Sequence, residues 1–332
     1  MFNNKSILIT GGTGSFGKKF LKKIIQKNKK IKRVVIFSRD EFKQSEMQKE
    51  FNPKKYRFLR YFIGDVRNKE RLKIALNEID IVIHAAALKQ VPTAEYNPFE
   101  FINTNILGAE NLIQACLENK VKKVIALSTD KASSPINLYG ATKLCSDKLF
   151  TAANNIRGKK EIVFSVVRYG NVLNSRGSVV PLFKEIAKKT NTLPITDPSM
   201  TRFHLSIDKA CEFVFECLNL AKGGEIFVPK IPSYKITDLA KSIKPNCKFK
   251  NIGIRPGEKL HEEMISINDS INTIHNKKMY IILPFDQIKT FKKNYYNFTK
   301  VPKNFTYNSL INPKYLTINE LKKVIFNQAE EI

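Results

Sequence analysis

Short apolar runs alternate with segments of helical spacing through the first half of the chain. The apolar runs predict buried strands at Ser6–Thr10, Arg33–Phe37, Phe58–Ile63, Ile79–His84, Val124–Ser128 and Ile162–Arg168. The segments between them predict helices at Phe16–Lys27, Asp40–Phe51, Lys69–Asn77, Asn103–Asn119 and Tyr139–Ala153. This alternation predicts an α/β fold, a Rossmann-type doubly wound parallel sheet with helices on both faces.

The regular alternation weakens after Gly170. Loops rich in Pro, Gly, Ser and Asn appear around 171–181 and 191–203, followed by predicted helices near 208–220 and 317–328. We therefore expect a Rossmann domain over residues 1–170, completed by part of 203–230. Residues 171–332 are expected to form mainly a smaller substrate-binding lobe at the carboxyl edge of the sheet, where open α/β sheets bind ligands.

The chain is strongly basic, with 57 Lys and Arg against 30 Asp and Glu and a formal net charge of +27. Such a charge is also typical of nucleic-acid-binding proteins. Here the basic residues are mostly lysines dispersed along the chain, as at Lys18-Lys19 and Lys277-Lys278, rather than one arginine-rich tract. This pattern favours solvated helix faces and no specific nucleic-acid site, although the charge should attract an anionic substrate.

Composition also bears on location and metal binding. The chain begins with a predicted strand rather than a signal peptide, and its apolar runs are shorter than the roughly 18 residues of a transmembrane helix. The five cysteines form no C-x-x-C pair and the four histidines are scattered. We expect a cytoplasmic protein with free thiols, no membrane insertion and no metal site.

A glycine-rich segment joins the first predicted strand to the first predicted helix. Glycine permits the tight turn, lets the backbone approach a pyrophosphate and allows close helix–strand packing, while the helix N-terminus offers free N–H groups. In this context the segment predicts a dinucleotide site. The candidate contacts are Gly11, Thr13, Gly14, Ser15, Phe16 and Gly17.

The residues after the second and third strands bear on which dinucleotide binds. Ser38, Arg39 and Asp40 follow the second strand, with Lys43 one turn later. A basic side chain here suits the 2′-phosphate of NADP, whereas a carboxylate suits NAD, so Arg39 and Lys43 favour NADP. Asp40 is interpreted as a helix cap. Asp65-Val66 is a candidate adenine contact, with an ordinary turn aspartate as the alternative.

Tyr139 and Lys143 form a Tyr-x-x-x-Lys motif on a predicted helix. The i, i+4 spacing places both side chains on one face. A lysine ammonium beside a phenol is expected to lower the phenol pKa, so that Tyr139 can accept a hydroxyl proton while hydride leaves the same carbon.

Together these motifs resemble the extended short-chain dehydrogenase/reductases that act on nucleotide sugars. Within that group the chain closely resembles the inverting UDP-N-acetylglucosamine 4,6-dehydratases that open the pseudaminic acid pathway. The matching stretches are Thr10–Gly17, Ser38–Met47, Gly64–Arg67, His84–Lys89, Ala94–Pro98, Ser128–Ala132, Asn137–Phe150, Arg168–Pro181, Met200–Phe203, Gly223–Pro232 and Gly253–Glu262.

The resemblance implies a reaction. UDP-N-acetylglucosamine would be oxidised at C4, would lose water across C5–C6 and would regain hydride at C6. The product would be UDP-2-acetamido-2,6-dideoxy-beta-L-arabino-hex-4-ulose, inverted at C5. The resemblance also implies tightly held NADP and a homo-oligomer, up to a hexamer.

Thr129-Asp130-Lys131 carries the resemblance to dehydratases in particular. Simple epimerases and reductases of this class have Ser or Thr in this region, whereas dehydratases place an acid and a base there. By resemblance Lys131 is the base for the C5 proton and Asp130 is the acid that assists loss of the C6 hydroxyl. We expect a neutral Lys131 amine, because the nicotinamide and Lys143 disfavour its protonated form.

Further contacts are implied by the resemblance alone. For the cofactor they are Ala85, Lys89 and Val172, and for the substrate they are Lys89, Thr129, Asn171, Arg176, Arg202, Arg255 and Glu258. The sequence departs from its relatives at Gln90, where they often have His, at Asn174, where they have Gly, and at His204, where they often have Trp. These positions bear on which sugar is accepted.

Alternative functions remain open. One is a C5-retaining UDP-sugar 4,6-dehydratase, although many retaining relatives carry an N-terminal membrane region and lack a tyrosine at the position of Tyr139. Another is a UDP-sugar 4-epimerase. A third, from a different class, is a basic nucleic-acid-binding protein on a Rossmann scaffold, which would need neither Asp130-Lys131 nor the Tyr139–Lys143 pair.

Overall fold

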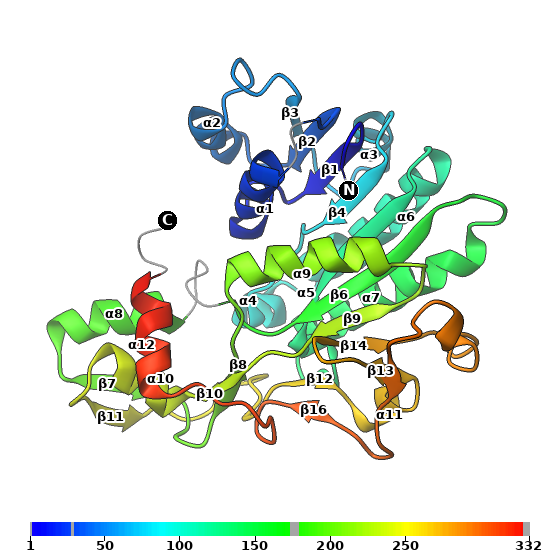
Figure 1. Cartoon of the computed structure of the whole chain (residues 1–332). Coiled ribbons are helices and arrows are strands. Elements are labelled where there is room, and N and C mark those ends of the chain that lie inside the picture. Colours follow the sequence, from blue (N-terminus) through cyan, green and yellow to red (C-terminus); the bar gives the residue numbers. More distant parts are fainter. Residues whose placement is uncertain (1, 28–29, 173–178, 328–332) are drawn as a thin grey trace.

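The computed structural model describes residues 2–27, 30–172 and 179–327 (Figure 1). Within them ten strands form the main sheet, in the order β15-β13-β14-β9-β6-β5-β4-β1-β2-β3. The parallel strands are β1 (Ser6–Thr10), β2 (Arg33–Ser38), β3 (Leu59–Ile63), β4 (Ile81–His84), β5 (Lys123–Thr129), β6 (Val163–Tyr169) and β9 (Ile226–Pro229). The antiparallel strands are β14 (Met279–Ile282), β13 (Thr273–His275) and β15 (Thr299–Lys300).

The predicted Rossmann-type sheet is confirmed, because β3-β2-β1-β4-β5-β6 follows the doubly wound order. The sheet is wider than predicted. Strand β9, from the second half of the chain, pairs with β6 in parallel, with Val166 opposite Ile226. Three antiparallel strands then extend it. The second half therefore contributes to the main sheet as well as to a lobe, and the boundary at residue 170 stays a prediction.

Helices cover both faces of the sheet. The first face carries α1 (Ser15–Lys27), α2 (Glu41–Glu50) and α9 (Ile207–Leu220), and the second carries α3 (Lys69–Ala75), α6 (Gly108–Glu118) and α7 (Leu138–Ile156). Strand β1 shows why: Ile7 and Ile9 pack with Phe20 of α1, while Leu8 packs into the core beneath α6 and α7. Alternate residues of a strand face opposite sides, and each buried Ile or Leu stabilises the fold by roughly 1.5–3 kcal/mol.

The helix predicted at Asn103–Asn119 differs at its beginning. Residues Ile102–Leu107 form a wide π-helical turn, and α6 starts only at Gly108. In this turn the buried Asn105 accepts a hydrogen bond from the backbone N–H of Leu88 at 2.9 Å and donates one to its carbonyl, also at 2.9 Å. The turn thereby fixes the loop that carries Lys89.

A smaller lobe lies beside the sheet and has its own apolar core, which includes Phe183, Leu239 and Leu321 (Figure 1). Its elements are α8 (Val179–Lys189), β7 (Thr192–Ile195), β8 (Thr201–Phe203), β10 (Ser233–Lys235), α10 (Ile236–Ile243), β11 (Lys248–Asn251) and α12 (Ile318–Asn327). The remaining short elements are α4 (Val91–Tyr96), α5 (Pro98–Phe101), β12 (Glu263–Ile265), α11 (Ile267–Ser270), β16 (Tyr307–Asn308) and single 3-10 turns at Asp130–Ala132 and Phe291–Lys293.

None of the helices in the described part of the chain has both the length and the apolar character needed to cross a bilayer.

Candidate active site

A cavity of about 1060 Å³ opens at the carboxyl ends of the parallel strands. Residues at or just after the ends of β1, β2, β4, β5 and β6 line one side. Residues from the second half of the chain, among them Arg202 and Arg255, also line it. The cavity therefore lies where open α/β sheets place their ligands.

The glycine-rich turn forms one end of the cavity. Gly11 has φ of +62°, and a Cβ there would lie 2.8 Å from the backbone nitrogen of Ala86. A Cβ on Gly17 would overlap the backbone of Gly12. Both positions therefore require glycine. Because α1 begins at Ser15, its unpaired N–H groups lie at the cavity, in the arrangement that suits a pyrophosphate.

The residues after β2 form another part of the cavity wall. Asp40 caps α2 and accepts a hydrogen bond from the backbone N–H of Lys43 at 2.9 Å, so its interpretation as a helix cap is confirmed. The Lys43 ammonium lies 2.6 Å from the same carboxylate and lowers the Asp40 pKa. Arg39 is half-exposed, with its guanidinium 3.9 Å from Asp65. Asp65 also accepts two 3.0 Å bonds from Arg67, as a structural turn aspartate does.

Tyr139 and Lys143 lie on one face of α7 and line the cavity, as the motif predicted. The predicted lowering of the Tyr139 pKa is wrong, because the pKa is raised. Burial raises the Tyr139 pKa to about 12 and outweighs the opposing effects of Lys131 and of the Thr129 hydroxyl. Burial also lowers the Lys143 pKa, against the attraction of Asp147. Tyr139 is thus a neutral phenol at neutral pH.

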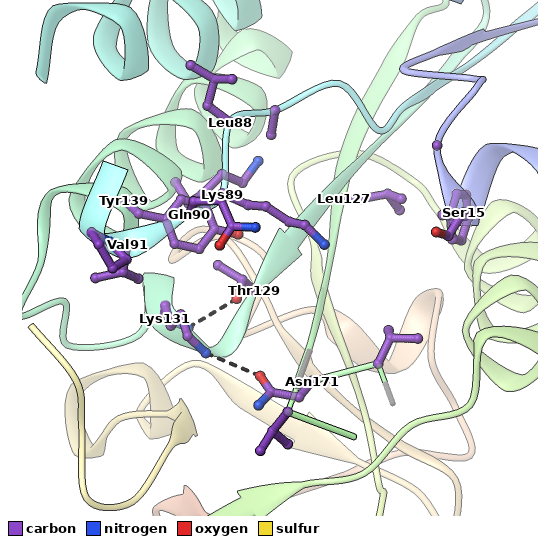
Figure 2. Close-up of a pocket in the computed structure, with 18 of the residues that line it drawn as sticks. Ser15, Leu88, Lys89, Gln90, Val91, Leu127, Thr129, Lys131, Tyr139 and Asn171 are labelled. Carbon is purple, nitrogen blue, oxygen red and sulfur yellow. Dashed lines mark hydrogen bonds between the residues drawn. The ribbon is translucent and has the colours of Figure 1, made fainter. Parts of the chain in front are cut away.

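Lys131 lies among three oxygen acceptors. Its Nζ donates to Asp130 Oδ1 at 3.1 Å and to Asn171 Oδ1 at 3.2 Å, and it lies 2.9 Å from Glu262 Oε1. Figure 2 shows the Lys131 side chain directed toward Asn171, across the cavity from Lys89. The backbone N–H of Lys131 also donates to the Thr129 hydroxyl at 3.4 Å.

These carboxylates overturn the expectation of a neutral Lys131 amine. Burial alone would lower the Lys131 pKa, but Asp130 and Glu262 outweigh it and raise the pKa above its ordinary value. The Asp130 pKa is shifted upward from that of an exposed aspartate. Its burial, and then the nearby Glu262, raise its pKa, which suits an acid that carries a proton.

The cavity brings together the predicted site residues of the described chain, with one exception. Asp130 does not line it, since its fully buried side chain packs against Gly170 behind the cavity wall. Arg176 lies outside the described residues. The predicted residues in the wall are Gly11, Thr13, Gly14, Ser15, Phe16, Gly17, Ser38, Arg39, Asp40, Lys43, Asp65, Val66, Ala85, Lys89, Thr129, Lys131, Tyr139, Lys143, Asn171, Val172, Arg202, Arg255 and Glu258.

Sequence and structure comparisons place this chain among known proteins. The profile of the polysaccharide biosynthesis protein family matches residues 7–284. The chain belongs to this family.

Two relatives and one solved structure are similar to the chain over nearly its whole length. A UDP-N-acetylglucosamine 4,6-dehydratase (inverting) from Campylobacter jejuni is 56% identical over 98% of both chains. A UDP-glucose 4-epimerase from Rickettsia felis is 43% identical over 98% of this chain and 97% of its own. The X-ray structure of Pen from Bacillus thuringiensis superposes with a TM-score of 0.90 at 40% identity and 99% coverage of both chains. The resemblance to inverting 4,6-dehydratases is confirmed.

Two features of this family member were not predicted from its sequence. Glu262 ends a stretch that carries the resemblance, but it was assigned no role, because it is remote from Lys131 in sequence. Asn105 gave no signal, since a helical asparagine is ordinarily exposed. Of the departures from relatives, Gln90 lines the cavity (Figure 2), His204 is buried outside it, and Asn174 lies outside the described residues.

Proposed function

We propose that the chain is an NADP-dependent UDP-N-acetylglucosamine 4,6-dehydratase that inverts C5. The observation that carries the proposal is the contact between Lys131 and Asp130 beside a cavity that also holds Tyr139. An acid and a base next to the redox site suit elimination of water, and the 56% identity to the Campylobacter jejuni dehydratase supports the same chemistry.

The chemistry is divided between the cofactor and the protein. NADP, when bound, supplies the acceptor and donor of hydride. The phenolate form of Tyr139, which the positive nicotinamide ring of bound NADP would favour against the effect of burial, takes the proton of the C4 hydroxyl as C4 becomes a ketone, which acidifies the C5 proton. Transfer of one proton from the Lys131 ammonium to Asp130, over 3.1 Å, produces an amine and a carboxylic acid together. The amine removes the C5 proton, and the acid protonates the departing C6 hydroxyl.

This step returns both groups to their starting charges. Lys131 is again an ammonium and Asp130 again a carboxylate once C6–O has broken and water has formed. Because Asp130 lies behind the wall, its proton needs a bridge. Thr129 lines the cavity and its hydroxyl donates to Asp130 at 3.0 Å, so this hydroxyl is the route. A proton from the solvent in the cavity then reaches C5 on the face opposite Lys131 and inverts that centre, while Tyr139 releases to the solvent the proton that it took from the C4 hydroxyl.

The product made in deuterated water tests the function. From UDP-N-acetylglucosamine we expect a 4-keto-6-deoxy sugar with one deuterium at C5, inverted C5 configuration, and the original C4 hydrogen at C6, all read by NMR. A product with retained C5 would replace the proposal with a retaining dehydratase.

A UDP-sugar 4-epimerase is the second candidate, because the Rickettsia felis relative named as one is 43% identical. An epimerase changes only C4 and has no need of an acid–base pair for C5. Formation of the C4 epimer without loss of water or deuterium uptake at C5 would establish this candidate instead.

The cofactor preference is expected to depend on Arg39. Arg39→Ala should weaken NADP binding by roughly tenfold to hundredfold, since charge-assisted hydrogen bonds contribute about 1.5–3 kcal/mol. NAD binding should change little, because NAD has no 2′-phosphate. Isothermal titration of both cofactors measures the difference. Arg33→Ala, at the other end of β2, is the control that should alter neither affinity. Equal losses for the two cofactors in Arg39→Ala would refute the NADP preference.

We further propose a cytoplasmic homo-oligomer without membrane insertion or a specific nucleic-acid site. Tyr96 and Phe99, on α4 and α5, are 88% and 74% exposed and support a surface that associates with another copy. Pseudaminic acid biosynthesis for flagellin glycosylation is the pathway consistent with the proposed product.

A further inference from the structure

Glu262 is a buried carboxylate in the cavity wall that the proposed mechanism does not use. It is 1% exposed, and its Oε1 lies 2.9 Å from Lys131 Nζ and 3.8 Å from Arg202 Nε. Within the described part of the chain, its Oε2 has no hydrogen-bond partner. Burying a carboxylate is costly unless cations compensate it, so its placement against Lys131 needs a reason.

The segment around Glu262 is fastened to the turn that carries Lys131. The Lys259 ammonium donates to the carbonyl of Ser133 at 2.6 Å, and the Ser133 hydroxyl donates to Glu263 at 3.2 Å. These bonds lie on either side of Glu262 in sequence. They hold its carboxylate at a fixed position relative to Lys131, rather than on a free loop.

We propose that Glu262 is the positioning residue for Lys131, which holds the ammonium in the cavity and sets the pH range over which the Asp130–Lys131 pair works. The inference rests on the proposed function, because it assigns Lys131 to the C5 proton. Glu262 acts through Lys131 and keeps its own charge, and no bond to the substrate is required of it.

The charges around Glu262 determine the direction of its effect. Asp130 and Lys131 face it from the 3-10 turn, Arg202 from β8 and Lys259 from its own loop. Tyr139 of α7 and Tyr234 of β10 also lie within the field of Lys131. Burial alone would raise the Glu262 pKa, but Lys131 and Arg202 outweigh burial and lower it, so Glu262 is ionised at neutral pH.

The fully protonated pair carries one titrating proton on Asp130 and one on Lys131. The pair is active when the two groups share only one of these protons. A neighbouring negative charge makes both protonation steps of such a pair more favourable and so raises both apparent pKa values. Loss of that charge lowers both. The acidic and the basic limbs of the kcat profile must then move together to lower pH.

Glu262→Gln keeps the shape of the side chain and removes only its charge. We expect both limbs of the kcat profile to move to lower pH by roughly one unit or more, the usual effect of a charge at this distance. KM for UDP-N-acetylglucosamine should change less than kcat at neutral pH. Glu262→Asp should restore part of the wild-type profile. Glu263→Gln removes one negative charge from the next residue but keeps an oxygen that can accept the hydrogen bond from the Ser133 hydroxyl, so the fastening of the segment is retained and the limbs should stay in place.

A second measurement separates this inference from the proposed function. Competitive labelling with acetic anhydride across pH, read by peptide mass spectrometry, follows the Lys131 amine without requiring turnover. Its reactivity should appear at lower pH in Glu262→Gln than in the wild type. Absence of dehydration by the wild type would overturn the proposed function. Unmoved limbs and unmoved Lys131 reactivity, in a variant that folds and binds UDP, would overturn the role of Glu262.

Discussion

Lys131→Met is expected to lower the rate of UDP-N-acetylglucosamine dehydration by a factor of about 10² or more, the usual contribution of a positioned base. Methionine keeps an unbranched side chain of similar length but cannot carry a proton. Cofactor and UDP affinity should change little, because the glycine-rich turn and Arg255 lie elsewhere in the cavity. Product formation by NMR and UDP binding by calorimetry measure the two effects separately.

The same substitution should also destabilise the fold. It leaves Asp130 and Glu262 buried without the cation between them, at a cost of about 3 kcal/mol, the lower end of the range for a broken buried pair because Lys131 faces the cavity. The double variant Lys131→Met with Glu262→Gln should recover part of that loss in urea unfolding. Full dehydration activity in Lys131→Met would remove the proposed base, whatever its stability.

Arg168→Met is expected to lower the free energy of unfolding by about 3–5 kcal/mol, as the loss of one partner does in buried ion pairs. Arg168 is 2% exposed and lies at the centre of a network that joins β6, α7 and the region of α11. It donates to the Met264 carbonyl at 3.0 Å and to the carboxylates of Asp147 at 3.2 Å and Asp269 at 3.3 Å. Without it, the fully buried Asp147 loses its paired cation and keeps only the attraction of Lys143.

Urea denaturation measures this effect, with Lys5→Met as the control. Lys5 pairs with Asp80 at 3.5 Å but is 39% exposed, so its loss should cost no more than about 1 kcal/mol. Comparable midpoints for the two variants would show that the Arg168 network does not stabilise the fold as argued.

The parts of the fold that sequence predicted are those with local signals. Strand β1 and helix α1 are identifiable because apolar spacing repeats within a few residues, and Asp40 is recognisable as a cap from its position alone. The extension of the sheet by the antiparallel strands β14, β13 and β15 was not predicted, because the strands that lengthen a sheet at its edge are chosen by the tertiary fold. Helix α8 was not predicted, because Gly177 just before it and Pro181 in its first turn are residues typical of loops.

In the candidate site, too, local sequence signals predicted some features, and others depend on the tertiary fold. Tyr139 and Lys143 were paired correctly, because four residues of a helix bring them to one face. Their pKa values were not, because burial depends on every element around them and exceeded the local charge effect. Glu262 contacts Lys131 only because the loop at 253–262 folds back over it, and no residue spacing in the sequence predicts that contact.

The position of β6 in the sheet has a consequence for synthesis of the chain. Its neighbours are β5, made before it, and β9, made well after it. Until residues 226–229 have left the ribosome, β6 presents an apolar strand with unpaired N–H and C=O groups, the kind of edge that promotes aggregation. A nascent chain that ends near residue 170 should therefore need a chaperone, and a gene split at that point should yield an insoluble first fragment.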